Sequence, residues 1–213
     1  MAPELKIHTL LRVRGAQALL RGEALPAWVE ESVERAPWVV VRRTLPREGQ
    51  VPVGVRGRLR EQRFATWVCV EDIFEYVTPQ ELVRRKAWSS VDRARRSSIP
   101  AVAVLDEVEG VLDEHGFGAV WGPGGSVGFE LASGVATATA SSDLDLVIEV
   151  DRLESFATGA RALWGALAEL PVRVDALLET SHGAVVLSEY VRAHDEGGAF
   201  VLRTTEGPCL TRL

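Results

Sequence analysis

Hydrophobic and polar positions in the second half of the chain follow two distinct periods. Apolar residues recur at helical spacing in four segments, 100–116, 126–134, 151–170 and 183–194. Alternating or short apolar runs predict four strands, at 119–122, 143–150, 172–180 and 199–207. Helices and strands in turn predict an α/β (α+β) domain, with a mixed sheet and flanking helices.

The first 95 residues carry shorter apolar runs that are rich in β-branched side chains. Residues 37–43 predict a strand, residues 49–55 a turn followed by a strand, and residues 54–70 extend the β pattern. Thr78, Pro79 and Glu81 then have the order of a capping box at a helix start. These patterns predict a small β-rich N-terminal domain.

Residues 84–96 are strongly basic and end in the sequence SSIP. Such a composition is typical of a linker or an exposed connection. We therefore predict a domain boundary after residue 95, with the β-rich domain at 1–95 and the α/β domain at 96–213. The basic segment fits either an ordinary solvated surface or a surface that steers an acidic partner.

Composition narrows the classes of function. The chain has 213 residues, 46% of them hydrophobic, and a net charge of −6, which gives no support for a nucleic-acid binder. Cys69 and Cys209 have neither metal-ligand nor redox spacing. No segment approaches the roughly 20 apolar residues of a membrane span, and the N-terminus has no signal-peptide pattern. We expect a cytoplasmic protein with no membrane or nucleic-acid partner.

Asp143 and Asp145 begin the alternating run 143–150. In a strand, residues two apart point to the same face, whereas in a helix they would diverge. Two close carboxylates repel one another, and a divalent cation such as Mg²⁺ or Mn²⁺ relieves the repulsion. A solvent-facing strand that carries two acids by chance is the alternative for this motif alone.

Gly124, Gly125 and Ser126 precede the predicted helix 126–134. Glycines let the backbone approach a ligand closely, and the N-terminus of a helix favours an anion. The serine hydroxyl can donate to the same phosphate. Trp121 beside this loop fits core packing, or contact with an adenine ring. A glycine-serine loop before a helix, followed by Asp-x-Asp on the next strand, predicts a phosphate site beside a metal site.

This order resembles the nucleotidyltransferase superfamily of the polymerase-β type. The sequence "WGPGGSVGFELASG" followed by "SSDLDL" further resembles the malonate decarboxylase holo-acyl-carrier-protein synthases, or phosphoribosyl-dephospho-coenzyme A transferases. The likeness extends to "PWVVVRR", "VPVGVRG", "HGAVVLSEYVR" and "VLRTTEGP", so that it covers most of the chain.

The resemblance implies a reaction and its partners. The substrate would be 2′-(5″-triphosphoribosyl)-3′-dephospho-coenzyme A, and the acceptor a serine of the apo acyl-carrier subunit of malonate decarboxylase. Pyrophosphate would be released. A nucleotidyltransferase with another acceptor and a non-catalytic nucleotide-binding homologue are the alternatives.

The resemblance also assigns roles to residues. Asp143 and Asp145 would bind Mg²⁺ or Mn²⁺, and Gly124, Gly125 and Ser126 would hold the pyrophosphate end of the substrate. A third carboxylate on the neighbouring strand would complete the metal site and help to deprotonate the carrier serine, with Asp175 preferred and Glu179 as its competitor. Among the N-terminal arginines, Arg43 and Arg56 are the preferred phosphate contacts.

Overall fold

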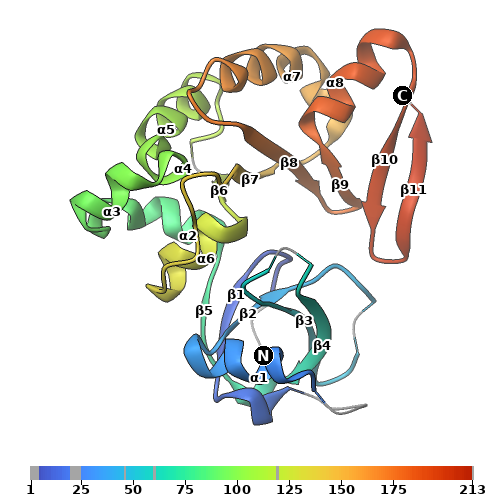
Figure 1. The fold of residues 1–213 in the computed structure, drawn as a ribbon. Coiled ribbons are helices and arrows are strands. Elements are labelled where there is room, and N and C mark those ends of the chain that lie inside the picture. The colour runs from blue at the N-terminus through green and yellow to red at the C-terminus, as the bar shows by residue number, and fades with distance from the viewer. Residues whose placement is uncertain (1–4, 20–24, 46, 60, 119, 213) are drawn as a thin grey trace. The chain divides into compact units, whose positions relative to one another are not determined.

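The structure, a computed structural model, describes residues 5–19, 25–45, 47–59, 61–118 and 120–212 (Figure 1). Its contacts divide the chain into two compact units, Met1–Thr78 and Pro79–Leu213. Each unit encloses a hydrophobic core of its own. Among the described residues, no helix is both long and apolar enough to cross a membrane.

The first unit is built on an antiparallel five-stranded sheet in the order β4-β3-β2-β1-β5. Its strands are β1 (Leu10–Val13), β2 (Trp38–Val41), β3 (Gln50–Arg56), β4 (Arg63–Cys69) and β5 (Ile73–Val77). Its helices are α1 (Ala27–Arg35) and the 3₁₀ turns η1 (Ala16–Ala18) and η2 (Val70–Asp72).

Strict alternation along β3 explains the core of this unit. Val51, Val53 and Val55 are buried, while the residues between them are half-buried. Val29 and Val33, one helical turn apart on α1, are buried in the same cluster. The predicted strands at 37–43 and 49–55 and the small β-rich N-terminal domain are confirmed.

The second unit holds a six-stranded mixed sheet in the order β11-β10-β9-β8-β7-β6. Its strands are β6 (Trp121–Pro123), β7 (Leu144–Glu149), β8 (Val174–Thr180), β9 (Gly183–Val186), β10 (Ala199–Thr204) and β11 (Gly207–Arg212). Its helices are α2 (Pro79–Arg84), η3 (Ala87–Ser90), α3 (Arg93–Ser98), α4 (Pro100–Ala103), α5 (Leu105–Glu114), α6 (Gly125–Ser133), α7 (Leu153–Ala168) and α8 (Leu187–Glu196).

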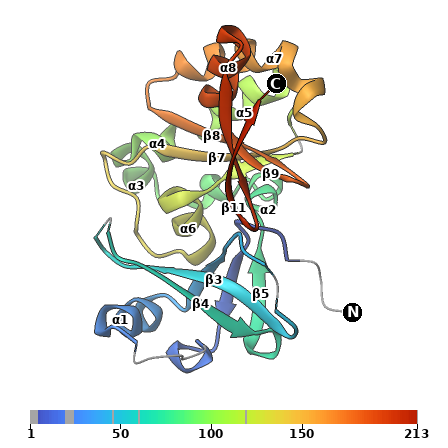
Figure 2. The ribbon, with the colours of Figure 1, turned by 90° about the vertical axis from the view of Figure 1, so that its right-hand side faces the viewer.

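Helices cover the two faces of this sheet unequally. Figures 1 and 2 show α5, α7 and α8 on one side of β7 and β8, and α6 on the other. Leu144, Leu146 and Ile148 of β7 are buried in the main core, which also contains apolar residues of α5, α7 and α8. On the opposite face of β7, Asp145 is exposed, whereas Val147, two residues further along, is buried. The predicted mixed α/β fold is confirmed.

The junction between the units lies at Thr78 and Pro79, seventeen residues before the boundary expected at residue 95. Residues 79–98 form α2, η3 and α3 instead of a linker. Trp88 is fully buried, its ring centroid lies 6.2 Å from that of Trp121, and its Nε1 donates to Asp106 at 2.7 Å. One buried tryptophan thus ties a basic segment into the core of the second unit.

Two further expectations differ from the structure near the C-terminus. Residues 183–186, expected as the start of a helix, form β9, and α8 begins only at Leu187. The apolar run Gly183–Val186 fits the period of either element, and its pairing with β8 selects the strand. The expected last strand is followed by a second one, β11, with which it forms a hairpin.

The buried ring of Trp88 predicts a large effect on stability. Trp88→Ala should lower the free energy of unfolding by roughly 3–5 kcal/mol, because it leaves a cavity in the core of the second unit. Trp164→Ala is the matched control: its side chain is 43% exposed on α7, so it should cost under about 1 kcal/mol. Urea unfolding measures both, and equal losses would contradict the position of Trp88 in the core.

Candidate functional site

Strand β7 presents alternating burial at the site that the sequence predicts. Asp145 is exposed, while Leu144 and Leu146 on either side of it are buried. Asp143 is also exposed and lies one residue before the first residue of β7. The hydrogen bond from the Leu144 amide to the Arg173 carbonyl, at 2.9 Å, begins the pairing with the next strand.

Strand β8 brings the third predicted carboxylate level with the second. The two strands are parallel, and Asp145 is the register partner of Asp175. Register partners on neighbouring strands point to the same face of a sheet. Glu179 is the register partner of Glu149, four residues further along, or roughly 13 Å at ~3.3 Å per residue. The register therefore favours Asp175 over Glu179 as the neighbour of Asp145.

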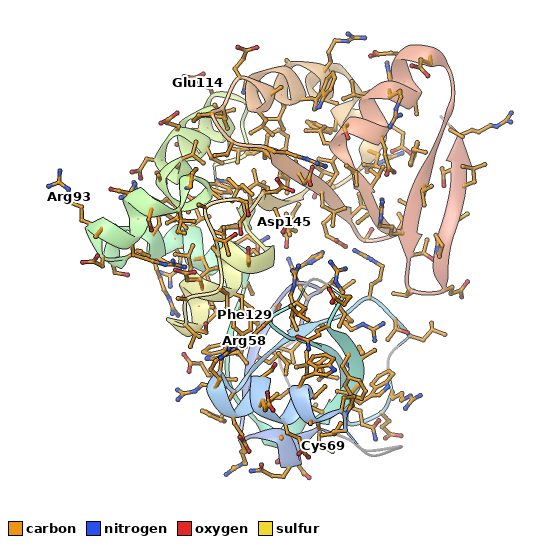
Figure 3. The ribbon with its side chains drawn as sticks, viewed as in Figure 1. Arg58, Cys69, Arg93, Glu114, Phe129 and Asp145 are labelled. Atoms are coloured by element: carbon orange, nitrogen blue, oxygen red, sulfur yellow. The ribbon has the colours of Figure 1, made fainter. Side chains whose placement is uncertain are left out.

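The glycine loop lies directly against Asp145 (Figure 3). The Gly124 amide donates to the Asp145 carbonyl at 2.8 Å. Gly125 has a φ of +54°, and a Cβ placed on it would lie 1.8 Å from Oδ2 of Asp145. Only glycine combines this backbone conformation with so close an approach. The loop and the acidic strand, about 20 residues apart in the sequence, are therefore in direct contact.

Helix α6 begins in this loop, as predicted, and ends at Gly134, which adopts the left-handed conformation. Gly124, its N-cap residue, has no side chain that could accept hydrogen bonds from the first turn. The amides of that turn have no intrahelical acceptors, and a helix N-terminus of this kind favours an anion. The hydroxyl of Ser126 lies at the same end of the helix, 3.4 Å from the hydroxyl of Ser142.

Asp143, Asp145 and Asp175 supply the type of donor atom that a divalent cation prefers, but their side chains are not arranged around a common point. Carboxylate oxygens are the ligands that Mg²⁺ and Mn²⁺ prefer. Asp175 forms an ion pair with Arg173 at 3.2 Å, and the two side chains are 41% and 71% exposed. Within the described ranges, no three His, Cys, Asp or Glu side chains form a group that could hold a metal.

The two predicted arginines belong to the first unit and lie apart from each other. Arg43 is two residues past Val41, which pairs with Val53, and Arg56 is three residues past Val53 in the antiparallel strand. They are thus separated by about five residues along the strands, or roughly 17 Å at ~3.4 Å per residue. Their backbone positions are therefore far apart on the sheet of the first unit.

Acidic partners neutralise most of the basic segment 84–96. Arg84 and Arg85 both bind Glu81, and the other ion pairs are Lys86–Glu109, Arg95–Glu130 and Arg96–Asp106. Arg93 is exposed at the outer end of α3 (Figure 3). The ordinary-surface interpretation of this segment is therefore favoured over a surface that attracts an acidic partner.

Two residues near the site depart from the expectations. Trp121 is fully buried, so contact between its ring and an adenine is excluded, and core packing accounts for it. The sequence patterns above do not point to Glu130 on α6, although it is buried and binds Arg95 at 2.7 Å. Its signal in the sequence is that it is the one charged residue between Gly125 and Ser133.

The ion pairs of Glu81 predict how stability depends on pH. Hydrogen bonds donated by Arg84 and Arg85 lower the pKa of Glu81 from an ordinary 4.5 to about 2. A carboxylate whose pKa is lower in the folded than in the unfolded protein adds stability at pH values above its unfolded-state pKa. This contribution is lost as the pH falls through its folded-state pKa. Urea unfolding should give wild type a higher free energy of unfolding than Glu81→Gln at pH 7. This difference in stability should shrink as the pH falls from about 4.5 to 2. A difference constant over that range would contradict the assignment.

Comparison with known proteins gives a consistent result for both units. Residues 86–213 match the family model described as phosphoribosyl-dephospho-CoA transferase MdcG C-terminal domain, and residues 6–79 match the corresponding N-terminal domain. No solved structure matches the chain.

Curated relatives carry the name phosphoribosyl-dephospho-CoA transferase. One from Pseudomonas syringae is 38% identical over 85% of this chain and 81% of its own, and one from Pseudomonas fluorescens is 41% identical over 78% and 75%. One from Klebsiella pneumoniae is 35% identical over 96% of this chain and 93% of its own. The chain belongs to the phosphoribosyl-dephospho-CoA transferase family.

Proposed function

We propose that the protein transfers the phosphoribosyl-dephospho-CoA group from 2′-(5″-triphosphoribosyl)-3′-dephospho-CoA to a serine of an apo acyl-carrier protein, with release of pyrophosphate. The acceptor that we propose is the acyl-carrier subunit of malonate decarboxylase. Membership of the family supports the transferred group. The contact between Gly125 and Asp145 is the structural observation that carries the proposal, because it joins an anion-binding loop to an acidic strand.

In the proposed reaction, the carrier serine oxygen bonds to the phosphorus next to the ribose. The bond from that phosphorus to the pyrophosphate oxygen breaks, and the serine proton passes to a carboxylate. Such a displacement requires the attacking and leaving oxygens to be held in line. The first-turn amides of α6 and the Ser126 hydroxyl would hold the leaving pyrophosphate. This division of roles is that of a polymerase-β-type nucleotidyltransferase.

Asp175 is the carboxylate that we propose as proton acceptor. Its register with Asp145 supports this choice over Glu179, which lies four residues further along β8. Arg173 shares an ion pair with Asp175 and would be released or shifted when a substrate engages that carboxylate. A general base must come within hydrogen-bond reach of the proton that it removes.

We propose Mg²⁺ or Mn²⁺ as the cofactor, held by Asp143 and Asp145 with Asp175 as third ligand. All three supply the hard oxygen donors that these cations prefer. A bound cation would neutralise the charge of the triphosphate and of the departing pyrophosphate. Arg43 and Arg56 of the first unit remain proposed phosphate contacts.

Intact mass spectrometry tests the proposed function directly. The protein is incubated with the triphosphoribosyl precursor, Mg²⁺ and the purified apo carrier, and we expect the carrier to gain one phosphoribosyl-dephospho-CoA group while pyrophosphate appears in equal amount. Other apo carriers in the same assay test the acceptor. An unmodified malonate decarboxylase carrier, with folded protein and intact precursor, would contradict the proposal.

The two acids of β7 predict the first loss of activity. Asp143→Ala and Asp145→Ala should each lower the rate of carrier modification by at least roughly 100-fold, because several kcal/mol of charge stabilisation are lost. Asp151→Ala, an exposed acid beyond the other end of β7, is the control and should retain the wild-type rate within about threefold. Full activity in Asp143→Ala would exclude the metal role of this residue.

The glycine loop gives a second prediction with a matched control. Gly125→Ala and Gly134→Ala both place a methyl group on a residue of positive φ, and each should cost roughly 1–2 kcal/mol of stability. Only the Gly125 methyl meets Asp145, whereas nothing lies within 4 Å of one at Gly134. Gly125→Ala should therefore lose transfer activity more than about tenfold, with Gly134→Ala close to wild type. Equal activities would show that the close approach is not required.

A further inference from the structure

Glu130 is a buried carboxylate whose hydrogen bonds reach outside its own helix. Its side chain is 7% exposed. One oxygen, Oε2, accepts from the backbone amides of Thr137 and Ala138, each at 2.8 Å, and from Arg95 at 2.7 Å. The other, Oε1, accepts from Nε of Arg95 at 2.8 Å. The carboxylate is thus surrounded by four donors.

Arg95 completes this arrangement from helix α3. Its guanidinium binds both oxygens of Glu130 in the parallel, two-pronged geometry that is strongest for arginine and a carboxylate. The same Nη2 also donates to the Ala138 carbonyl at 2.7 Å. Asp92 caps the helix through the amides of Ala94 and Arg95, which fixes the backbone from which the side chain extends.

The electrostatic balance shows that Glu130 is held in its charged form. Burial by itself would raise the pKa of Glu130, but hydrogen bonds from Arg95, Thr137 and Ala138 outweigh burial and leave the pKa below its ordinary value. A buried carboxylate is costly unless it is paired and hydrogen-bonded. Replacing Arg95 would therefore remove the main compensation for this charge.

The segment that Glu130 holds, residues 135–142, connects α6 to β7 without regular secondary structure. It reaches the glycine-serine loop at two points. The Thr137 hydroxyl donates to the Ser126 carbonyl at 2.9 Å, and the Ser142 hydroxyl lies 3.4 Å from that of Ser126. Asp143 is the residue that directly follows Ser142. The segment therefore links the two halves of the candidate site. It contacts Ser126 of the glycine-serine loop, and it leads directly into Asp143.

We propose that Arg95 and Glu130 form a positioning pair that holds segment 135–142 and thereby sets Ser126 and Asp143 in the arrangement needed for transfer. Neither residue contacts the reacting groups; both act through the segment. The kinetic part of this inference rests on the proposed function, whereas the tether itself is a property of the second unit alone. A displacement of about 1 Å at a reacting centre can cost roughly 100-fold in rate.

The neighbouring pair Arg96–Asp106 provides a matched control. Arg96 extends from the same helix and is 28% exposed, close to the 32% of Arg95. Its partner Asp106 accepts from Trp88, and the hydrogen bonds of this pair lead to α5 and η3 instead of segment 135–142. Loss of Arg96 therefore destabilises the same unit without releasing the segment.

Hydrogen exchange tests the tether without reference to activity. Arg95→Met, Glu130→Gln and Arg96→Met are compared with wild type under native conditions. The amides of Thr137 and Ala138 should exchange at least about tenfold faster in the first two variants and within about threefold of wild type in Arg96→Met. Arg95→Lys keeps the charge but loses the two-pronged geometry, so the two amides should exchange at an intermediate rate. This variant replaces Arg95→Met in the test if Arg95→Met does not fold.

Kinetics then test the positioning role on the same variants. We expect kcat for carrier modification to fall at least about tenfold in Arg95→Met and Glu130→Gln, and the Mg²⁺ concentration for half the maximal rate to rise at least about fivefold. A loss of folded protein alone would lower the rate but leave that midpoint unchanged. Arg96→Met should keep the wild-type midpoint, and Arg95→Lys should recover part of it.

The outcomes separate the two claims. Wild-type exchange at Thr137 and Ala138 in both pair variants would overturn the tether, as would equal acceleration in Arg96→Met. Faster exchange with an unchanged Mg²⁺ midpoint and kcat would overturn the positioning role. If the wild-type protein modifies no carrier, the proposed function fails and the positioning role fails with it, while exchange still decides the tether.

Discussion

The backbone of Gly124 and Gly125 lies against Asp145, and the arrangement of the candidate site depends on this contact. The Gly124 amide donates to the Asp145 carbonyl, and the missing side chain of Gly125 leaves room for the carboxylate. The same two residues start helix α6, so that its first-turn amides open beside the acidic strand. The proposed anion site and the proposed cation site would therefore share one wall, as displacement at a triphosphate requires.

The rest of the second unit keeps this wall in place. The buried face of β7 fixes which of its residues point outward, and the parallel pairing of β7 with β8 brings Asp175 level with Asp145. On the other side of the loop, Glu130 and Arg95 tie the irregular segment 135–142 to α6 and α3. Apolar burial thus orients the acids, whereas a buried ion pair orders the connection between the two halves of the site.

Local patterns predicted the parts of the fold that rest on local physics. Alternation along 143–150 identified β7, and helical spacing that ends at Gly134 identified α6. The apolar run 183–186 fits a helix as well as a strand, and its hairpin pairing with β8 selects the strand against the helical prediction. The basic segment 84–96 also contains a buried tryptophan and the partners of three acids, Glu109, Glu130 and Asp106, which local patterns do not predict because only the fold brings these residues together. The register that places Asp145 beside Asp175 likewise depends on the pairing of two strands and could not be read from local patterns.

The crystal structure of the protein with Mn²⁺ and a non-hydrolysable analogue of the triphosphoribosyl precursor would test the central claim most directly. We expect an anomalous Mn²⁺ peak coordinated by oxygens of Asp143 and Asp145, at about the 2.1 Å of a hexacoordinate divalent site. The terminal phosphates should lie on the first-turn amides of α6 and the Ser126 hydroxyl. Manganese bound elsewhere, or phosphates on another face of the second unit, would contradict the account.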